Sequence, residues 1–130
     1  MTTAAAVPAA ISDFYCHQAI PGLVDIDVVT ETDRVLAFRH TRPSHPVHIV
    51  VVPKEHVPSL VDLGDENADL LLEVMDVVRE VAGKVRAEHG AASITTNEGL
   101  YQESKHMHWH VYHRGETEKE ILSMYGHHDG

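Results

Sequence analysis

Polar and apolar residues alternate in one short segment near the end of the chain, His106-Met107-His108-Trp109-His110-Val111-Tyr112. Successive side chains of a β-strand point to opposite faces, so residues two apart share a face. The pattern predicts a half-buried strand over 106–113, with three histidines on one face and Met107, Trp109 and Val111 in a core on the other. Neighbouring imidazoles on such a face lie about 6–7 Å apart, because the rise is about 3.3 Å per residue. The three rings could then converge on one small anion or one metal ion.

Four further strands are indicated upstream of this segment. The segments 24–30 and Val35–Arg39 flank a polar turn and predict a hairpin. The run 47–52 is β-branched apart from His48, which is typical of a central strand. Ser93–Thr96 is the remaining strand, and residues 97–105 form a loop before the histidine segment.

One long helix is predicted over 65–89. Asp65 is placed to cap its first turn, and Gly90 is a fitting terminator. The expected apolar stripe consists of Leu71, Val74, Met75, Val78, Ala82 and Val85. A short helix or turn is expected over 11–18. Strands followed by one long helix and then more strands predict an α+β fold with a five-stranded antiparallel sheet, rather than a doubly wound fold.

Composition excludes some classes of function. The formal net charge is -10, whereas a general nucleic-acid binder needs a basic surface that neutralises phosphates. No apolar run approaches the length of a membrane span, and the first ten residues lack the charged region of a signal peptide. The single cysteine, Cys16, cannot form an internal disulfide, which fits a reducing compartment. We therefore expect a cytoplasmic protein with no membrane or nucleic-acid partner.

Several motifs accompany the histidine segment in a fixed order. They are Arg34-Val35-Leu36-Ala37-Phe38 with Pro43 and Pro46, then Val47-His48-Ile49-Val50-Val51-Val52-Pro53-Lys54-Glu55-His56, and then Asn97-Glu98-Gly99 with Gln102. In these motifs the chain resembles the histidine-triad (HIT) family of nucleotide hydrolases and transferases, across residues 13–114. The resemblance divides the chain into a flexible leader over 1–10, a HIT-like domain over 11–114 and a polar tail over 115–130.

The resemblance implies catalysis through a covalent nucleotidyl-histidine. His108 would attack the α-phosphorus of a nucleoside 5′-phosphoramidate or a related nucleotidyl ester or anhydride, and water would release the nucleotide. A neutral imidazole is a competent nucleophile near pH 7. His110 would donate to phosphoryl oxygens and assist the leaving group, and His48 and His106 would support these two rings. No cofactor is required by this chemistry.

Substrate contacts are implied for a second set of residues. Asn97 and the backbone N–H groups of the following loop, with Gly99 and Gln102, would hold the phosphate oxygens. The family usually has an aspartate for the ribose hydroxyls where this chain has His40. A serine or threonine that contacts the leaving group usually follows the loop glutamine. Here Glu103 stands in that place and Ser104 comes next.

A zinc site is a second implication of the resemblance. Many bacterial relatives carry Cys-x-x-Cys near the N-terminus, completed by the equivalents of His48 and His106. This chain retains Cys16 and has Asp13 at the first cysteine position. Structural zinc prefers four nitrogen or sulfur ligands, so such a site would be poor.

Alternative functions remain open at the level of sequence. His-x-His on a strand is a common zinc arrangement, and His48 could complete a metal-dependent hydrolase site. His40 and Glu103 lend support to a nucleotide-binding regulatory module with weak turnover. For the nucleotide hydrolase and for the nucleotide-binding module alike, the expected ligand is a small-molecule nucleotide. The family commonly forms twofold dimers with a continuous sheet, and an exposed edge strand makes such a homodimer plausible here.

Overall fold

The computed structural model describes residue 22 and residues 25–126. The expected leader over 1–10, the expected short helix over 11–18 and Cys16 lie outside the described residues. No helix in the described part of the chain has the length and apolar character needed to cross a membrane.

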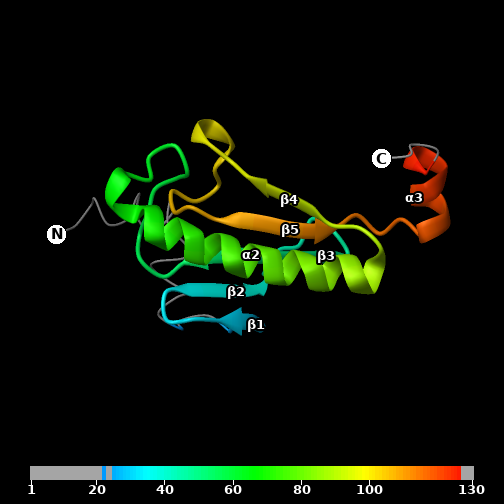
Figure 1. Ribbon diagram of the computed structural model, residues 1–130, viewed down its shortest axis with the longest axis horizontal. Coiled ribbons are helices and arrows are strands. Elements are labelled where there is room, and N and C mark those ends of the chain that lie inside the picture. The colour runs from blue at the N-terminus through cyan, green and yellow to red at the C-terminus, as the bar shows by residue number, and fades with distance from the viewer. Residues whose placement is uncertain (1–21, 23–24, 127–130) are drawn as a thin grey trace.

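A five-stranded antiparallel sheet forms the body of the molecule (Figure 1). Its strands are β1 (Val28–Glu31), β2 (Val35–Arg39), β3 (Val47–Pro53), β4 (Ser93–Thr96) and β5 (Trp109–His113), in the spatial order β1-β2-β3-β5-β4. Every neighbouring pair is antiparallel. The predicted α+β class and the five-stranded sheet are confirmed, and β3 is the central strand.

Two strands are shorter than predicted. β1 begins at Val28 rather than at residue 24. β5 begins at Trp109 rather than at residue 106, because its last partners in the neighbouring strands are Val51 and Thr96. The backbone before β5 bonds elsewhere, since the N–H of Met107 donates to the carbonyl of Val57 over 2.6 Å. The expectation that all three histidines belong to one strand was therefore wrong.

A long helix, α2 (Ala68–His89), covers one face of the sheet and follows a single 3-10 turn over Asp65–Asn67. Asp65 does not cap α2. It lies inside the 3-10 turn, and the N-cap residue of α2 is Asn67. Gly90 ends the helix with φ at 90°, a conformation that disfavours any side chain, and its N–H donates to the carbonyl of Arg86.

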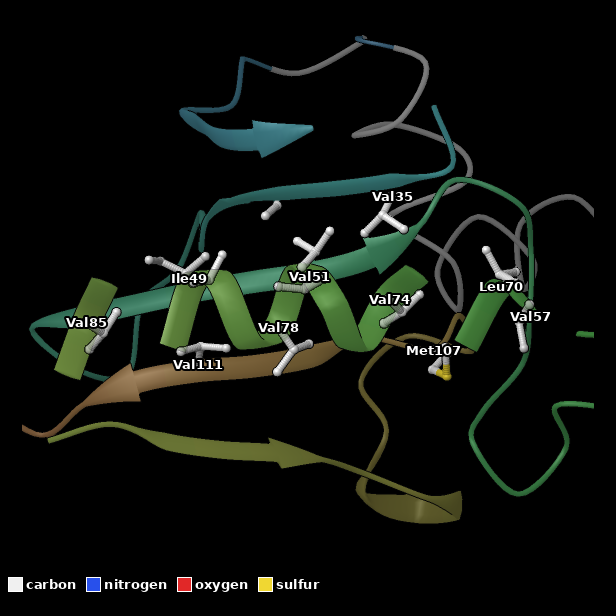
Figure 2. Packing of buried hydrophobic residues seen from close by; sticks show 13 residues of the cluster. Val35, Ile49, Val51, Val57, Leu70, Val74, Val78, Val85, Met107 and Val111 are labelled. Atoms are coloured by element: carbon white, nitrogen blue, oxygen red, sulfur yellow. The ribbon is translucent and has the colours of Figure 1, made fainter. Parts of the chain in front are cut away.

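The core lies between α2 and the sheet (Figure 2). The buried residues of α2 are Leu70, Val74, Val77, Val78, Val81 and Val85. The predicted stripe was correct at Val74, Val78 and Val85, whereas Leu71, Met75 and Ala82 are only partly buried. The helix is thus rotated by about one residue position relative to the prediction. Met107 and Val111 are fully buried against it, as the alternating pattern predicted.

The strand register shows which side chains lie on the sheet face opposite α2. His48 pairs with Tyr112 and Val50 with His110, so these four residues point away from α2. Thr95 pairs with His110 across β4 and β5 and shares that face. Polar residues of three strands therefore lie together on the face that α2 does not cover.

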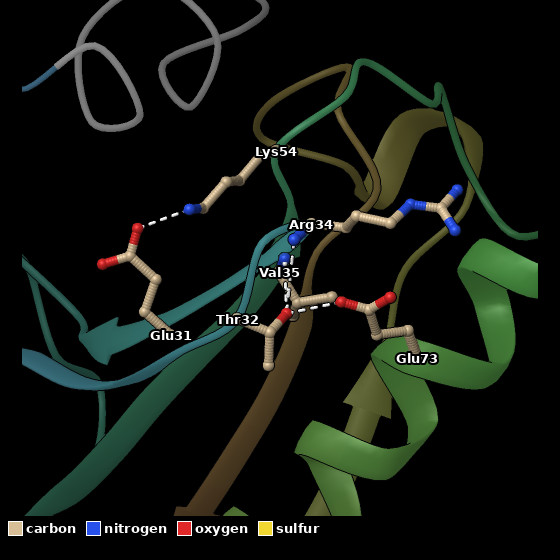
Figure 3. A network of polar contacts seen from close by, with 6 residues as sticks. All are labelled: Glu31, Thr32, Arg34, Val35, Lys54 and Glu73. Atoms are coloured by element: carbon tan, nitrogen blue, oxygen red, sulfur yellow. Dashed lines mark hydrogen bonds and ion pairs between the residues drawn. The ribbon is translucent and has the colours of Figure 1, made fainter.

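The hairpin between β1 and β2 is fixed by one side chain (Figure 3). The hydroxyl of Thr32 accepts from the N–H groups of Arg34 and Val35 and donates to Glu73 of α2 over 2.6 Å. Lys54 and Glu31 form an ion pair next to it. These contacts join the predicted turn to the helix.

A further helix follows β5 in the segment expected to be a polar tail. This helix, α3 (Glu118–Tyr125), begins with a capping box in which Thr117 and Glu120 each accept from the other's backbone N–H. The Thr-x-x-Glu spacing is the sequence signal that could have predicted it.

Candidate active site

A pocket of about 210 Å³ lies on the sheet face opposite α2. Its walls are formed by His40, Ser44, His45, His48, Thr95, Asn97, Glu103, His110 and Tyr112. Four of the predicted site residues line it, from β3, β5 and the segments after β2 and β4: His40, His48, Asn97 and His110. The antiparallel register brings these distant segments together.

His48 and His110 form a direct contact at the centre of the pocket. Their Nε2 and Nδ1 atoms lie 2.8 Å apart. The backbone N–H of Ser44 donates to Nδ1 of His48 over 3.1 Å, so in the neutral ring the proton is on Nε2. That proton is donated to Nδ1 of His110, and the proton of neutral His110 is consequently on its Nε2.

Both rings are neutral at pH 7. Burial lowers the pKa of His48 to about 4, assisted by the nearby rings of His40 and His45. Burial also lowers the pKa of His110 to about 3, with further lowering from His108, His48, His40 and His45. Neutral rings fit the hydrogen-bond pattern, because a protonated His48 would present a proton to the Ser44 N–H.

His108 lies beside His110, with ring centroids 5.0 Å apart in an edge-to-face arrangement. Its side chain is 3 % exposed. Nδ1 of His108 donates over 2.7 Å to the carbonyl of His106, two residues earlier, so the lone pair of the neutral ring is on Nε2. Burial lowers the pKa of His108, and the hydrogen bond to this carbonyl acts in the opposite direction.

His106 has a different position from the other two histidines of its segment. Its ring is fully buried, and Nε2 donates to the carbonyl of Pro53 over 2.7 Å. It also contacts the ring of His56, with centroids 5.3 Å apart. His106 therefore joins the loop before β5 to the end of β3, and the three imidazoles do not face one common point.

His40 and Glu103 form one side of the pocket. The ring of His40 stacks on His48 at 4.4 Å, and its Nδ1 accepts from the N–H of Arg42 over 2.9 Å. Burial lowers the pKa of His40, and the negative charge of Glu103 raises it. Glu103 also raises the pKa of His108. A carboxylate thus lies close to both rings.

Three predicted substrate contacts lie elsewhere. Among the described residues, the lining of the pocket does not include Gly99, Gln102 or Ser104. The Gln102 side chain donates to the carbonyl of Pro58 over 2.8 Å, and the carbonyl of Gly99 accepts from Lys105. Ser104 is buried.

Some pocket residues were missed from sequence. Ser44 and His45 belong to an irregular loop, whose course no pattern predicts. Tyr112 follows His110 by two residues, so the strand alternation was enough to place it on the same face. Its ring stacks on His45 at 4.1 Å.

The predicted zinc ligands are not arranged around one ion within the described residues. Nε2 of His106 is directed at the carbonyl of Pro53, and Nε2 of His48 is directed at His110 rather than at His106. The third predicted ligand, Cys16, lies outside the described residues. The one group of metal-ligating side chains found among the described residues is a different one, His40, His48 and His110.

Comparison with known proteins places this geometry in a family. The model of the HIT domain matches residues 23–117, most of the chain. The chain belongs to the HIT family. The HIT-family chain is 33 % identical over 87 residues to the purine nucleoside phosphoramidase of Escherichia coli K12, a match covering 65 % of this chain and 73 % of that protein.

Solved structures agree with this assignment. A HIT family hydrolase from Legionella pneumophila is 26 % identical, with a TM-score of 0.71, and the match covers 81 % of this chain and 94 % of that chain. A zinc-bound histidine triad family protein from Mycobacterium smegmatis is 24 % identical, with a TM-score of 0.70, covering 85 % of this chain and 80 % of that chain. The latter likeness shows the fold alone. This HIT protein therefore has a hydrolase-type function, as in the HIT family.

Proposed function

We propose that this HIT protein hydrolyses nucleoside 5′-phosphoramidates, or related nucleotidyl esters and anhydrides, through a nucleotidyl group on His108. The observation that carries the proposal is the hydrogen bond from Nδ1 of His108 to the carbonyl of His106. It fixes the tautomer in which Nε2 has the lone pair. The same carbonyl stabilises the positive charge that the ring acquires when Nε2 bonds to phosphorus.

The proposed reaction has two displacements. In the first, Nε2 of His108 attacks the α-phosphorus, the bond to the leaving nitrogen or oxygen breaks, and the leaving group takes one proton from solution. In the second, the oxygen of water attacks phosphorus, the bond to Nε2 breaks, and water returns one proton to solution. The nucleoside monophosphate is released, and His108 regains its lone pair. Splitting one displacement into two lowers each barrier.

His110 is the proposed donor to the reacting phosphate. The chain of hydrogen bonds from Ser44 through His48 fixes the proton of His110 on Nε2. This N–H group can donate to a phosphoryl oxygen or to the leaving atom. An anionic substrate raises the pKa of His110, because a nearby negative charge favours the protonated ring. Preorganised donors of this kind supply much of the catalysis in phosphoryl transfer.

Asn97 is the proposed phosphate contact among the remaining residues of the pocket. It lines the pocket directly after β4. Gly99 and Gln102, whose hydrogen bonds lie within the loop and with Pro58, remain proposed substrate contacts together with the buried Ser104. We propose that no cofactor takes part in the reaction.

The first test is release of AMP from adenosine 5′-phosphoramidate, measured for the wild type and for His108→Ala with and without EDTA. The proposal predicts turnover that EDTA leaves unchanged and that the substitution abolishes. Turnover that EDTA abolishes would support the metal-dependent alternative. Equal turnover in the two proteins would exclude His108 as the nucleophile.

A nucleotide-binding module with weak turnover is the second candidate. Glu103 favours it, because a carboxylate on the wall of the pocket repels a phosphate. Turnover of the wild type and of His108→Ala, measured together with calorimetric binding of AMP to both proteins, separates the two functions. An enzyme loses turnover on this substitution and keeps binding, whereas a binding module has little turnover in either form.

A homodimer is proposed for the assembled protein. β4 lies at the edge of the sheet, and Ile94 on it is 48 % exposed. Unpaired edge strands tend to pair with a second chain. Sedimentation equilibrium of the wild type is expected to give the mass of two chains. For Ile94→Lys the expected mass is that of a single chain. The mass of a single wild-type chain would contradict the dimer.

A further inference from the structure

We propose that His40, His48 and His110 form a site for Zn²⁺ in which the metal ion inhibits the enzyme. Each of the three side chains offers one ring nitrogen, and these nitrogens lie within 4.8 Å of one another. The set differs from the zinc ligands expected from sequence, because it contains His40 and His110 in place of Cys16 and His106. Metal binding itself does not depend on the proposed hydrolysis, whereas the inhibitory effect rests on it.

The ring nitrogens are spaced close to what a zinc site requires. Zn–N bonds are about 2.0–2.1 Å long, so tetrahedral ligand atoms are about 3.4 Å apart. His48 and His110 already have nitrogens 2.8 Å apart, and the His40 ring lies on His48 with centroids at 4.4 Å. The ring centroids of His110 and His40 lie 5.9 Å apart. Three histidine ligands leave a fourth position open to water or substrate.

The electrostatic surroundings favour a cation. Glu103 lines the same pocket, and its negative charge acts on His40. This carboxylate opposes the binding of a phosphate but attracts a metal ion. The three rings are neutral near pH 7, and a neutral imidazole is the form that binds zinc.

Binding has a specific consequence for one loop. The N–H groups of Arg42 and Ser44 donate to Nδ1 of His40 and of His48. Coordination through Nε2 moves the proton of each neutral ring to Nδ1, where it faces the donating N–H. Both hydrogen bonds break, and the loop must move. The metal ion also takes the place of the hydrogen bond between Nε2 of His48 and Nδ1 of His110. The two rings then move apart, and His110 leaves the position from which its Nε2–H group donates to the phosphate.

Cobalt(II) is the probe for the test, because its visible absorption reports tetrahedral coordination. The full chain, freed of metal, is titrated with Co²⁺ and then with Zn²⁺ in competition. We expect one Co²⁺ per chain at this site, with at least a tenfold loss of affinity in His40→Asn. The control, His89→Ala, removes a histidine that lies outside the pocket and stacks on His113, and it is expected to retain the affinity. Circular dichroism verifies that both variants are folded.

The outcomes separate the inference from the proposed function. Absence of Co²⁺ binding, or binding that His40→Asn leaves unchanged, would overturn the site whatever the enzyme does. Faster amide exchange at Arg42 and Ser44 on addition of Zn²⁺ is expected, and unchanged exchange would contradict coordination through Nε2. Zn²⁺ is expected to inhibit turnover of the wild type reversibly and that of His40→Asn much less. Failure of hydrolysis alone leaves the cobalt result decisive.

Discussion

Nε2 of His48 lies 2.8 Å from Nδ1 of His110, and this contact links β3 to β5 on the sheet face opposite α2. The two residues are not directly paired across the strands, since His48 pairs with Tyr112 and His110 with Val50. The contact is therefore diagonal, and long side chains reach across such a diagonal. It transmits the proton arrangement set by the backbone of Ser44 to the ring proposed to contact the phosphate.

Replacing His48 tests the role of this contact. In His48→Ala, the proton of His110 is no longer held on Nε2, so turnover is expected to fall about 100-fold while substrate affinity changes little. Steady-state kinetics with adenosine 5′-phosphoramidate measures the two effects separately. The control, His89→Ala, removes a histidine that stacks on His113 and does not line the pocket. Equal rates in the two variants would refute the proposed role of His48.

Stability is expected to decrease in mild acid. The unfolded chain takes up protons on histidine near pH 6.5, whereas folded His48 and His110 do so near pH 4 and pH 3. Between these values the unfolded state binds more protons, so the free energy of unfolding falls as the pH falls from 6.5. Urea denaturation in EDTA at pH 7 and pH 5 measures the change. The pH dependence should be weaker in His48→Ala, and an unchanged dependence would contradict the pKa of His48.

Glu103→Gln is expected to have opposite effects on two ligands. Removing the carboxylate reduces repulsion of a phosphate, so the affinity for AMP should rise severalfold. The affinity for Co²⁺ should fall, because the negative charge beside His40 is lost. Calorimetry with each ligand gives the two values. Changes of the same sign would show that Glu103 does not act through its charge.

The core between α2 and the sheet is tested by a matched pair of leucines. Leu70 is fully buried and Leu72 is 65 % exposed. Leu70→Ala is expected to lower the free energy of unfolding by about 2–5 kcal/mol, and Leu72→Ala to change it by less than about 0.5 kcal/mol. Urea denaturation measures both. Similar losses would mean that the face of α2 toward the sheet is wrongly assigned.

Local patterns predicted the elements of the fold well. Alternation placed Met107 and Val111 in the core, and the glycine after α2 ended the helix as expected. The order of the strands and the helix along the sequence was sufficient to predict an α+β fold with an antiparallel sheet. The rotation of α2 was displaced by one position, because Leu71 and Met75 have the same apolar character as the buried Leu70 and Val77.

The site depended on contacts that no local pattern contains. His106 lies outside the sheet because the pairing of β5 with β3 and β4 stops at Trp109, and the backbone before it bonds to Val57. The stacking of His40 on His48 follows from the antiparallel pairing of β2 and β3 and from the loop between them. The family resemblance named His108 and His110, but the proton positions required the hydrogen bonds of Ser44 and His106.

The stereochemical course at phosphorus tests the central claim most directly. A nucleoside phosphoramidate made chiral at the α-phosphorus with sulfur is hydrolysed in ¹⁸O-labelled water, and the configuration of the product is determined. Two in-line displacements through His108 predict retention of configuration, since each step inverts it. Inversion would mean that water attacks the phosphorus directly, and it would contradict a nucleotidyl-histidine intermediate.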